Sequence, residues 1–211
     1  LTHFVNRPGL ETQLARAISA SRLEGHVLAL VTFDVDRFSA INESLGGPVG
    51  DGILRSIAGR LAGAVRTRDI LARIGPDEFA VGFVSVKGTA GCEIAARKVQ
   101  AVFSTPFEVG ERSIPISASF GVSVYPEDGE DAPALMRSAD AALRHAKTGE
   151  GGALEFFRRE MTARAMETLE IETRLRQAIA NGELLLHYQP QVDVETGRVV
   201  GAEALVRWKD P

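Results

Sequence analysis

The sequence predicts an α+β domain with a central, mainly antiparallel sheet wrapped by helices. Apolar residues recur at helical spacing in several segments, and strand-like apolar runs lie between those segments. Some of the strand-like runs are joined by short turns such as Gly75-Pro76-Asp77, which favours hairpins over repeated βαβ units. The chain has 211 residues, of which 45% are hydrophobic, enough for one ample domain and part of another.

The first helix and strand follow directly from local patterns. Pro8 suits the first turn of a helix, and the apolar spacing behind it predicts a helix over residues 8–24. A nearly continuous apolar run predicts a strand over residues 27–36. Because this run scarcely alternates, we expect the strand to be covered on both faces.

Two helices are predicted next. A short helix over residues 39–45 ends at Gly46-Gly47-Pro48, and helical spacing predicts another over residues 51–61. Asp51 would start this second helix, where an acid suits the helix dipole. That structural role does not exclude a role in binding a ligand.

The middle of the chain predicts a hairpin and then alternating elements. The hairpin spans residues 69–86 around the turn Gly75-Pro76-Asp77. Beyond it, helices are predicted at residues 89–103 and 132–147, and strands at residues 107–109, 113–116, 116–125 and 153–157.

The last part of the chain has a different character. Residues 158–180 form a long charged helical segment that ends at Asn181-Gly182, a good helix C-terminus. Two strands are predicted at residues 183–192 and 198–208. The predicted organisation is therefore a domain at 1–157, a helical linker at 158–182 and a fragment of a second domain at 183–211.

Acidic residues gather at the predicted strand ends. Asp34 and Asp36 close the first strand on one face, and Asp77 lies at the hairpin turn beside Glu78. Carboxylates at the end of a buried strand need a partner, and Mg²⁺ is bound by a few carboxylates together with phosphate oxygens. A metal site from Asp34 and Asp77 is one interpretation, and unrelated solvated acids are the other.

The turn Gly75-Pro76-Asp77-Glu78-Phe79 resembles the signature of the GGDEF family, the diguanylate cyclases. Residues 186–208 resemble the opening of EAL phosphodiesterase domains. Further segments resemble GGDEF motifs at the family's spacing; they are residues 1–7, 33–38, 41–42, 50–51, 119–122 and 139–147.

The resemblance implies a sheet similar to nucleotidyl cyclase and polymerase palm domains. It also implies that two domains, each holding one GTP, meet face to face and join the two GTP molecules into cyclic di-GMP with Mg²⁺ or Mn²⁺. The implied site residues are Asp34, Asp77 and the Val35 carbonyl for the metal, Asp77 and Glu78 for catalysis, Asn42 and Asp51 for guanine, and Lys147 for phosphate.

Three positions depart from the family pattern. Pro76 stands at the second glycine of the signature, where it fixes φ and removes an N–H donor. Ser39 replaces a common phosphate-binding lysine, and Gly151 replaces a common arginine. Each charge-assisted phosphate contact is worth about 1.5–3 kcal/mol, so these departures predict weakened catalysis.

Two further sites are implied by the resemblance. Arg66 and Asp69 match the family's Arg-x-x-Asp product-inhibition site, which is the favoured interpretation; a polar loop between a helix and a strand is the alternative. Glu203 matches a metal ligand of EAL domains, whose other metal ligands would lie beyond residue 211.

Three functions remain open on these grounds. The favoured one is a degenerate GGDEF domain that binds GTP and regulates an attached EAL phosphodiesterase; a working cyclase and a structural dimerisation module are the others. The net charge of −4 gives no case for nucleic-acid binding, and no segment looks able to span a membrane. The single Cys92 fits a reducing cytoplasm. The resemblance implies a longer protein that forms a homodimer and responds to cyclic di-GMP, with room for a membrane tether upstream.

Overall fold

The computed structural model describes residues 1–149 and 151–209, without the side chains of residues 162–170 and 172. Two compact units make up the chain, Leu1–Thr162 and Ala163–Pro211. Their boundary falls inside the long charged segment that the sequence singles out as a linker.

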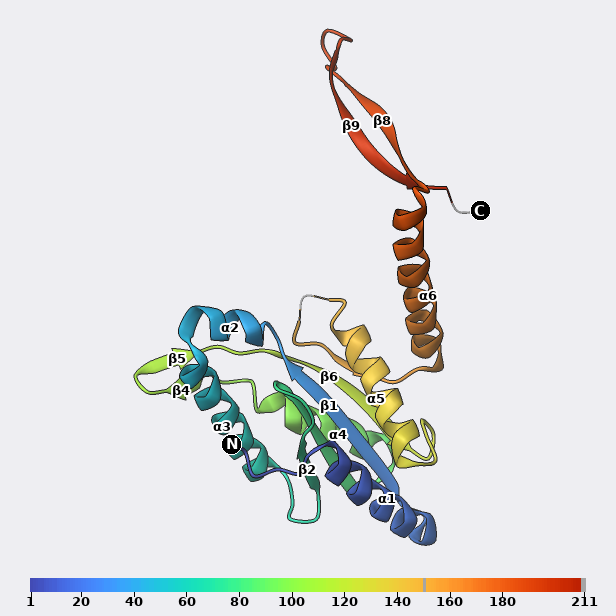
Figure 1. The fold of residues 1–211 in the computed structure, drawn as a ribbon. Helices are drawn as coiled ribbons and strands as arrows, with labels where there is room; N and C mark the ends of the chain where they lie inside the picture. Colours follow the sequence, from blue (N-terminus) through green and yellow to red (C-terminus); the bar gives the residue numbers. More distant parts are fainter. Residues whose placement is uncertain (150, 210–211) are drawn as a thin grey trace. The chain divides into compact units, whose positions relative to one another are not determined.

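A five-stranded sheet forms the centre of the first unit; Figure 1 labels its strands β1, β2 and β6. The strand order is β2-β3-β1-β6-β7. All neighbouring strands run antiparallel except the pair β6 and β7, so the predicted fold class is confirmed. The strands are β1 (Val27–Val35), β2 (Ile70–Arg73), β3 (Glu78–Val86), β6 (Ala118–Tyr125) and β7 (Leu154–Phe156).

Helices cover both faces of this sheet. The apolar core on one face contains residues of α3 and α4, and the core on the other face contains residues of α1 and α5. A two-stranded ribbon, β4 (Phe107–Val109) and β5 (Arg112–Ile114), lies next to α3. The helices are α1 (Arg7–Glu24), α2 (Phe38–Leu45), α3 (Gly47–Ala64), α4 (Gly88–Ala101) and α5 (Ala132–Ala146).

The central strand β1 contributes to both cores by alternation. Val31 and Phe33 point into the core on the α3 and α4 side, while Leu28 and Leu30 point toward α1 and α5. Every residue from Leu28 to Val35 is buried, which confirms the prediction of a strand covered on both faces. Asp34 is the last even-numbered residue of this strand, so by the same alternation its side chain leaves the strand on the α1 and α5 side.

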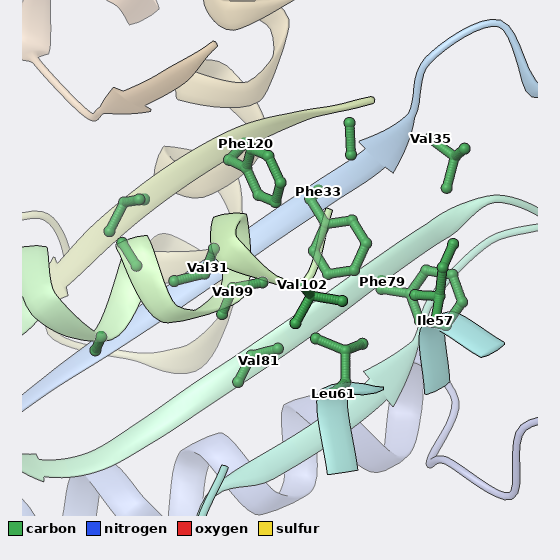
Figure 2. Packing of buried hydrophobic residues seen from close by; sticks show 14 of the residues in the cluster. Val31, Phe33, Val35, Ile57, Leu61, Phe79, Val81, Val99, Val102 and Phe120 are labelled. Atoms are coloured by element: carbon green, nitrogen blue, oxygen red, sulfur yellow. The ribbon is translucent and has the colours of Figure 1, made fainter. Parts of the chain in front are cut away.

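Aromatic rings hold the core beneath the end of β1. Phe33 stacks on Phe79 with a centroid distance of 5.3 Å and an interplanar angle of 9°. Phe120 contacts Phe33 with a centroid distance of 5.4 Å (Figure 2). Phe103 contacts Phe33 at the same centroid distance. This close packing restricts movement of the strand ends that carry Asp34 and Glu78.

The predicted start of the second of the two neighbouring helices α2 and α3 was wrong. Helix α3 begins at Gly47, with Pro48 in its first turn, so Gly46-Gly47-Pro48 both ends α2 and starts α3. Gly46 takes a φ of 87°, which allows this direct change of direction. Asp51 consequently lies in the second turn of α3, and the helix-dipole role suggested for it loses its basis.

The second unit is built from most of one helix and a hairpin. Helix α6 runs over Arg159–Asn181, and β8 (Leu184–Val192) pairs antiparallel with β9 (Val199–Trp208). Glu203 lies opposite Gln189 in this hairpin and is exposed. Within the described part of the chain, no helix is long and apolar enough to cross a membrane.

Candidate metal and nucleotide site

Asp34 is the centre of the site. It is 8% exposed at the end of β1, opposite Glu78 of β3 on one side and Ser119 of β6 on the other. Lys147, at the C-terminal end of α5, places its Nζ 2.6 Å from Asp34 Oδ2. The sequence assigned Lys147 to phosphate; in the structure this ammonium group is paired with the buried carboxylate.

The acids around Asp34 outnumber the cations. Burial raises the pKa of Asp34, and the negative charges of Asp77 and Asp36 add to this effect, whereas Lys147 opposes it. Burial also raises the pKa of Glu78, with further contributions from Asp34 and Asp140. A divalent cation would relieve this excess of negative charge.

The hairpin turn is tied directly to β1. The Val35 N–H donates to the Asp77 carbonyl at 3.2 Å, and the Ile74 N–H donates to the Glu78 carbonyl at 2.9 Å. The Arg73 guanidinium donates to the Pro76 carbonyl at 2.6 Å. These bonds hold Asp77 beside the end of β1, although the two segments are far apart in sequence.

Pro76 fits this turn without distorting the hairpin. Strands β2 and β3 stay in register up to Arg73 opposite Phe79, and none of residues 75–77 has a positive φ. Glu78 packs closely on the turn, because a Cβ on Gly75 would lie 2.8 Å from Glu78 Oε2 and 3.1 Å from Glu78 Cβ. Strand β3 starts only at Glu78, so Asp77 belongs to the turn. Both acids interact with Asp34: the charge of Asp77 raises the pKa of Asp34, and the charge of Asp34 raises the pKa of Glu78.

These residues fit a hard divalent cation. Asp34 and Asp77 could offer carboxylate oxygens to such a cation, and the Val35 carbonyl belongs to the same strand end as Asp34. Such an all-oxygen set suits Mg²⁺ or Mn²⁺ better than a soft metal. The buried, destabilised charge of Asp34 is the observation that favours an added cation.

The predicted guanine residues lie on α2 and α3. Asn42 reaches across from α2 to α3, where a Cβ on Gly50 would lie 1.9 Å from Asn42 Oδ1. Asp51 follows Gly50 directly and is exposed. The glycine therefore leaves room for the Asn42 side chain at the junction of the two helices, one residue before Asp51.

The Arg66–Asp69 loop is well formed by its own hydrogen bonds. Asp69 Oδ2 accepts from the Arg66 N–H at 2.8 Å, and Asp69 Oδ1 accepts from the Val84 N–H at 3.3 Å. The Arg66 side chain is exposed. Asp69 thus shapes the loop, and Arg66 is the member of the pair that is open to a ligand.

Comparison with known proteins identifies the family to which the chain belongs. Residues 1–152 match the family described as "Diguanylate cyclase, GGDEF domain". The chain belongs to the GGDEF family. Residues 172–211 match the EAL domain family, so the GGDEF domain is followed by the start of an EAL domain.

Relatives of the GGDEF–EAL type match the whole chain. It is 37% identical over 211 residues to the Pseudomonas aeruginosa protein named "Bifunctional diguanylate cyclase/cyclic di-GMP phosphodiesterase MucR", covering 100% of this chain and 31% of the relative. It is 35% identical over 211 residues to "Cyclic di-GMP phosphodiesterase NbdA" of the same species, covering 100% of this chain and 27% of the relative. The chain therefore spans about a third or less of the length of these curated relatives.

A solved structure supports the fold. The GGDEF domain of TpbB, also called YfiN, from Pseudomonas aeruginosa superposes with a TM-score of 0.75 at 31% identity, covering 78% of this chain and 96% of that chain. The GGDEF fold and membership of the cyclic di-GMP signalling family are thus established for this chain. The individual site residues remain predictions.

Two of the departures from the GGDEF pattern, Ser39 and Gly151, lie in different surroundings in the structure. Ser39 is exposed on α2. Gly151 has a φ of 89°, and a Cβ on it would lie 2.9 Å from Asp36 Oδ2. The loop as folded therefore accepts glycine at 151 and strains any larger residue.

Sequence reasoning missed one polar cluster at the site. Asp36 accepts hydrogen bonds from Ser117 Oγ at 2.7 Å, Ser119 Oγ at 2.8 Å and the Gly152 N–H at 3.0 Å. The sequence placed Asp36 on the same face as Asp34 but gave no partner for it. The hydrogen-bond partners of Asp36 lie more than 80 residues further along the chain, so no local pattern could reveal them.

Proposed function

We propose that the GGDEF domain binds GTP with a divalent cation and regulates an attached EAL phosphodiesterase, with little or no synthesis of cyclic di-GMP. The observation that carries this proposal is the buried Asp34 beside Asp77 and the Val35 carbonyl. An excess of buried negative charge disfavours the empty site and favours a metal–triphosphate complex.

Each group of residues has a defined task in this proposal. A bound cation would neutralise charge on the triphosphate. Asp34 and Asp77 would hold it, and Lys147 would turn from Asp34 to a phosphate oxygen once the metal takes its place. Asn42 and Asp51 would accept and donate hydrogen bonds along the guanine edge, at the junction of α2 and α3.

Regulation of an EAL phosphodiesterase is supported by the order of the two domains and by the names of the relatives. Both Pseudomonas aeruginosa relatives carry a phosphodiesterase name, and one also carries a cyclase name. The homodimer, a cytoplasmic location and the response of the EAL domain to GTP belong to the proposal.

A working cyclase is the second candidate. It is favoured by one observation, the closure of the signature turn in register despite Pro76. A non-binding dimerisation module is less well supported, because such a module gains nothing from a buried carboxylate with a raised pKa.

Guanine preference is the first expected result. GTP with Mg²⁺ should bind at least about tenfold more tightly than ATP, because a site built to hydrogen-bond one base edge leaves polar groups unpaired with another. Asn42→Ala should remove most of this preference, as measured by calorimetry with both nucleotides. Asn181→Ala, a matched change in the second unit, should leave it unchanged. Equal affinity of the unmodified chain for GTP and ATP would remove the guanine assignment.

Binding of cyclic di-GMP to the Arg66–Asp69 loop is the second expected result. Arg66→Ala should weaken binding by about tenfold or more, since a guanidinium–phosphate contact is worth about 1.5–3 kcal/mol. Arg68→Ala is the control, because Arg68 is also exposed in the same loop and carries the same charge. Equal losses in both variants would indicate general electrostatic attraction instead of a site at Arg66.

A further inference from the structure

Asp36 is a carboxylate near the proposed metal site, and neither the metal nor the guanine assignment uses it. It accepts three hydrogen bonds, from Ser117 and Ser119 at the start of β6 and from the main chain of Gly152. We name this group the Asp36 network. Its negative charge acts on Asp34, so the network lies close to the metal ligands.

The main chain of Asp36 takes part in the same arrangement. The Asp36 N–H donates to the Ser117 carbonyl at 3.0 Å, on the β6 side of β1. In a planar trans peptide the N–H and the preceding carbonyl point in opposite directions. The Val35 carbonyl must therefore point away from β6, toward the hairpin side of the strand.

The hairpin side is where Asp77 lies. Strand β1 sits between β3 and β6, and the Val35 N–H already donates to the Asp77 carbonyl on the β3 side. The Val35 carbonyl is thus directed to the same side as the turn that carries Asp77. The orientation of this one peptide decides whether its oxygen can complete a metal site.

We infer that Asp36 is a positioning residue, which orients the Val35–Asp36 peptide for the metal without touching the metal itself. Two serine hydroxyls and the Gly152 N–H hold its side chain, and the Ser117 carbonyl holds its main chain. This role rests on the proposed metal–GTP function and adds the residue that sets the geometry of that site.

The same network ties a second element to the site. Gly152 follows the loop after Lys147, and the Gly152 carbonyl accepts from Gln100 Nε2 at 3.1 Å. Asp36 Oδ2 occupies the space that a side chain on Gly151 would need. Asp36 therefore fixes both the Val35 carbonyl and the main chain of Gly152.

Two substitutions of Asp36 separate hydrogen bonding from charge. In Asp36→Asn the amide oxygen could still accept from Gly152 and Ser117, and the Ser119 hydroxyl could turn to accept from the amide N–H. Asp36→Ala would keep none of these bonds. A positioning residue should therefore tolerate Asp36→Asn and fail with Asp36→Ala, whereas a metal ligand should fail with both.

The measured quantity is the ratio of GTP affinity with Mg²⁺ to GTP affinity without it, determined by calorimetry. Asp36→Ala should lower this ratio by about 10–100-fold, the usual loss when a residue behind a metal ligand is removed. Asp36→Asn should keep it within about threefold. Asn42→Ala is the reference, since it should weaken GTP binding with and without Mg²⁺ alike.

The possible outcomes distinguish failure of the inference from failure of the proposed function. An equal loss in Asp36→Asn and Asp36→Ala, or an unchanged ratio in Asp36→Ala, overturns the inference. If thermal melting shows that Asp36→Ala does not fold, Ser117→Ala takes its place. Ser117 is exposed, and the loss of its hydroxyl removes one hydrogen bond of the network. An unchanged affinity ratio in Ser117→Ala also overturns the inference. Failure of the unmodified chain to bind GTP at all would instead overturn the proposed function, and the inference with it.

Discussion

Replacing Gly121 with alanine is expected to destabilise the GGDEF domain by about 3 kcal/mol or more. Gly121 lies in β6 directly under α5, and a Cβ there would lie 2.2 Å from the Ala139 carbonyl oxygen and 2.3 Å from the Leu143 nitrogen. Both contacts are with main-chain atoms of α5, which cannot turn aside as a flexible side chain could. The helix would have to move away from the sheet.

This displacement would reach the functional site as well. Helix α5 ends at Ala146, and the next residue is Lys147, whose Nζ is 2.6 Å from Asp34 Oδ2. The free energy of unfolding, measured with urea, should fall, and metal-dependent GTP binding should fall with it.

The control is the same substitution at open positions of α3. Gly59 and Gly63 are exposed, and a Cβ at either meets no atom within 4 Å. Gly59→Ala and Gly63→Ala should each stabilise the domain by about 0.5–1 kcal/mol, because alanine favours a helix interior over glycine. A Gly121→Ala protein as stable as these controls would mean that α5 does not pack on β6 as closely as described.

The chain is expected to bind GTP but to make little or no cyclic di-GMP. Pro76 has no N–H to offer a phosphate, and Ser39 offers no positive charge. Each missing charge-assisted contact should cost about tenfold or more in rate. Since the turn itself closes normally, the missing donors, and not a distorted hairpin, are the expected cause of slow turnover.

Restoration of these donors gives the sharpest test. Ser39→Lys combined with Pro76→Gly should raise turnover by about tenfold or more over the unmodified chain. Ser44→Lys with Pro76→Gly is the matched control, because it adds the same charge to an exposed position of the same helix. Cyclic di-GMP and its linear hydrolysis product should both be quantified, with Mg²⁺ and with Mn²⁺, at protein concentrations that allow dimers.

Adding Gly151→Arg to that pair should not help. The sequence alone suggests that an arginine there would supply a further phosphate contact. In the structure Gly151 has a φ of 89°, and its side-chain space is taken by Asp36. We therefore expect the triple variant to be less stable than the double variant and no more active. Robust turnover by the unmodified chain would contradict the explanation by missing donors and support the working cyclase.

Much of the fold could be predicted because its signals are local. Apolar spacing indicated the helices, and the buried run before Asp34 indicated β1 nearly to the residue. The start of α3 was missed, because Gly46-Gly47-Pro48 looks like a break in the sequence but serves as the first turn of a new helix. Short-range signals of this kind specify elements well and boundaries less well.

The sequence by itself determined which residues are candidates, since Asp34, Asn42, Asp51, Asp77 and Lys147 stand at recognisable spacings. Only the tertiary structure decided how they are held. It paired Lys147 with Asp34, placed Asn42 over Gly50 and filled the space beside Gly151 with Asp36. The physical reason is that β1 joins strands from distant parts of the chain, so the partners of its carboxylates are set by strand register and helix packing, which no local pattern of residues encodes.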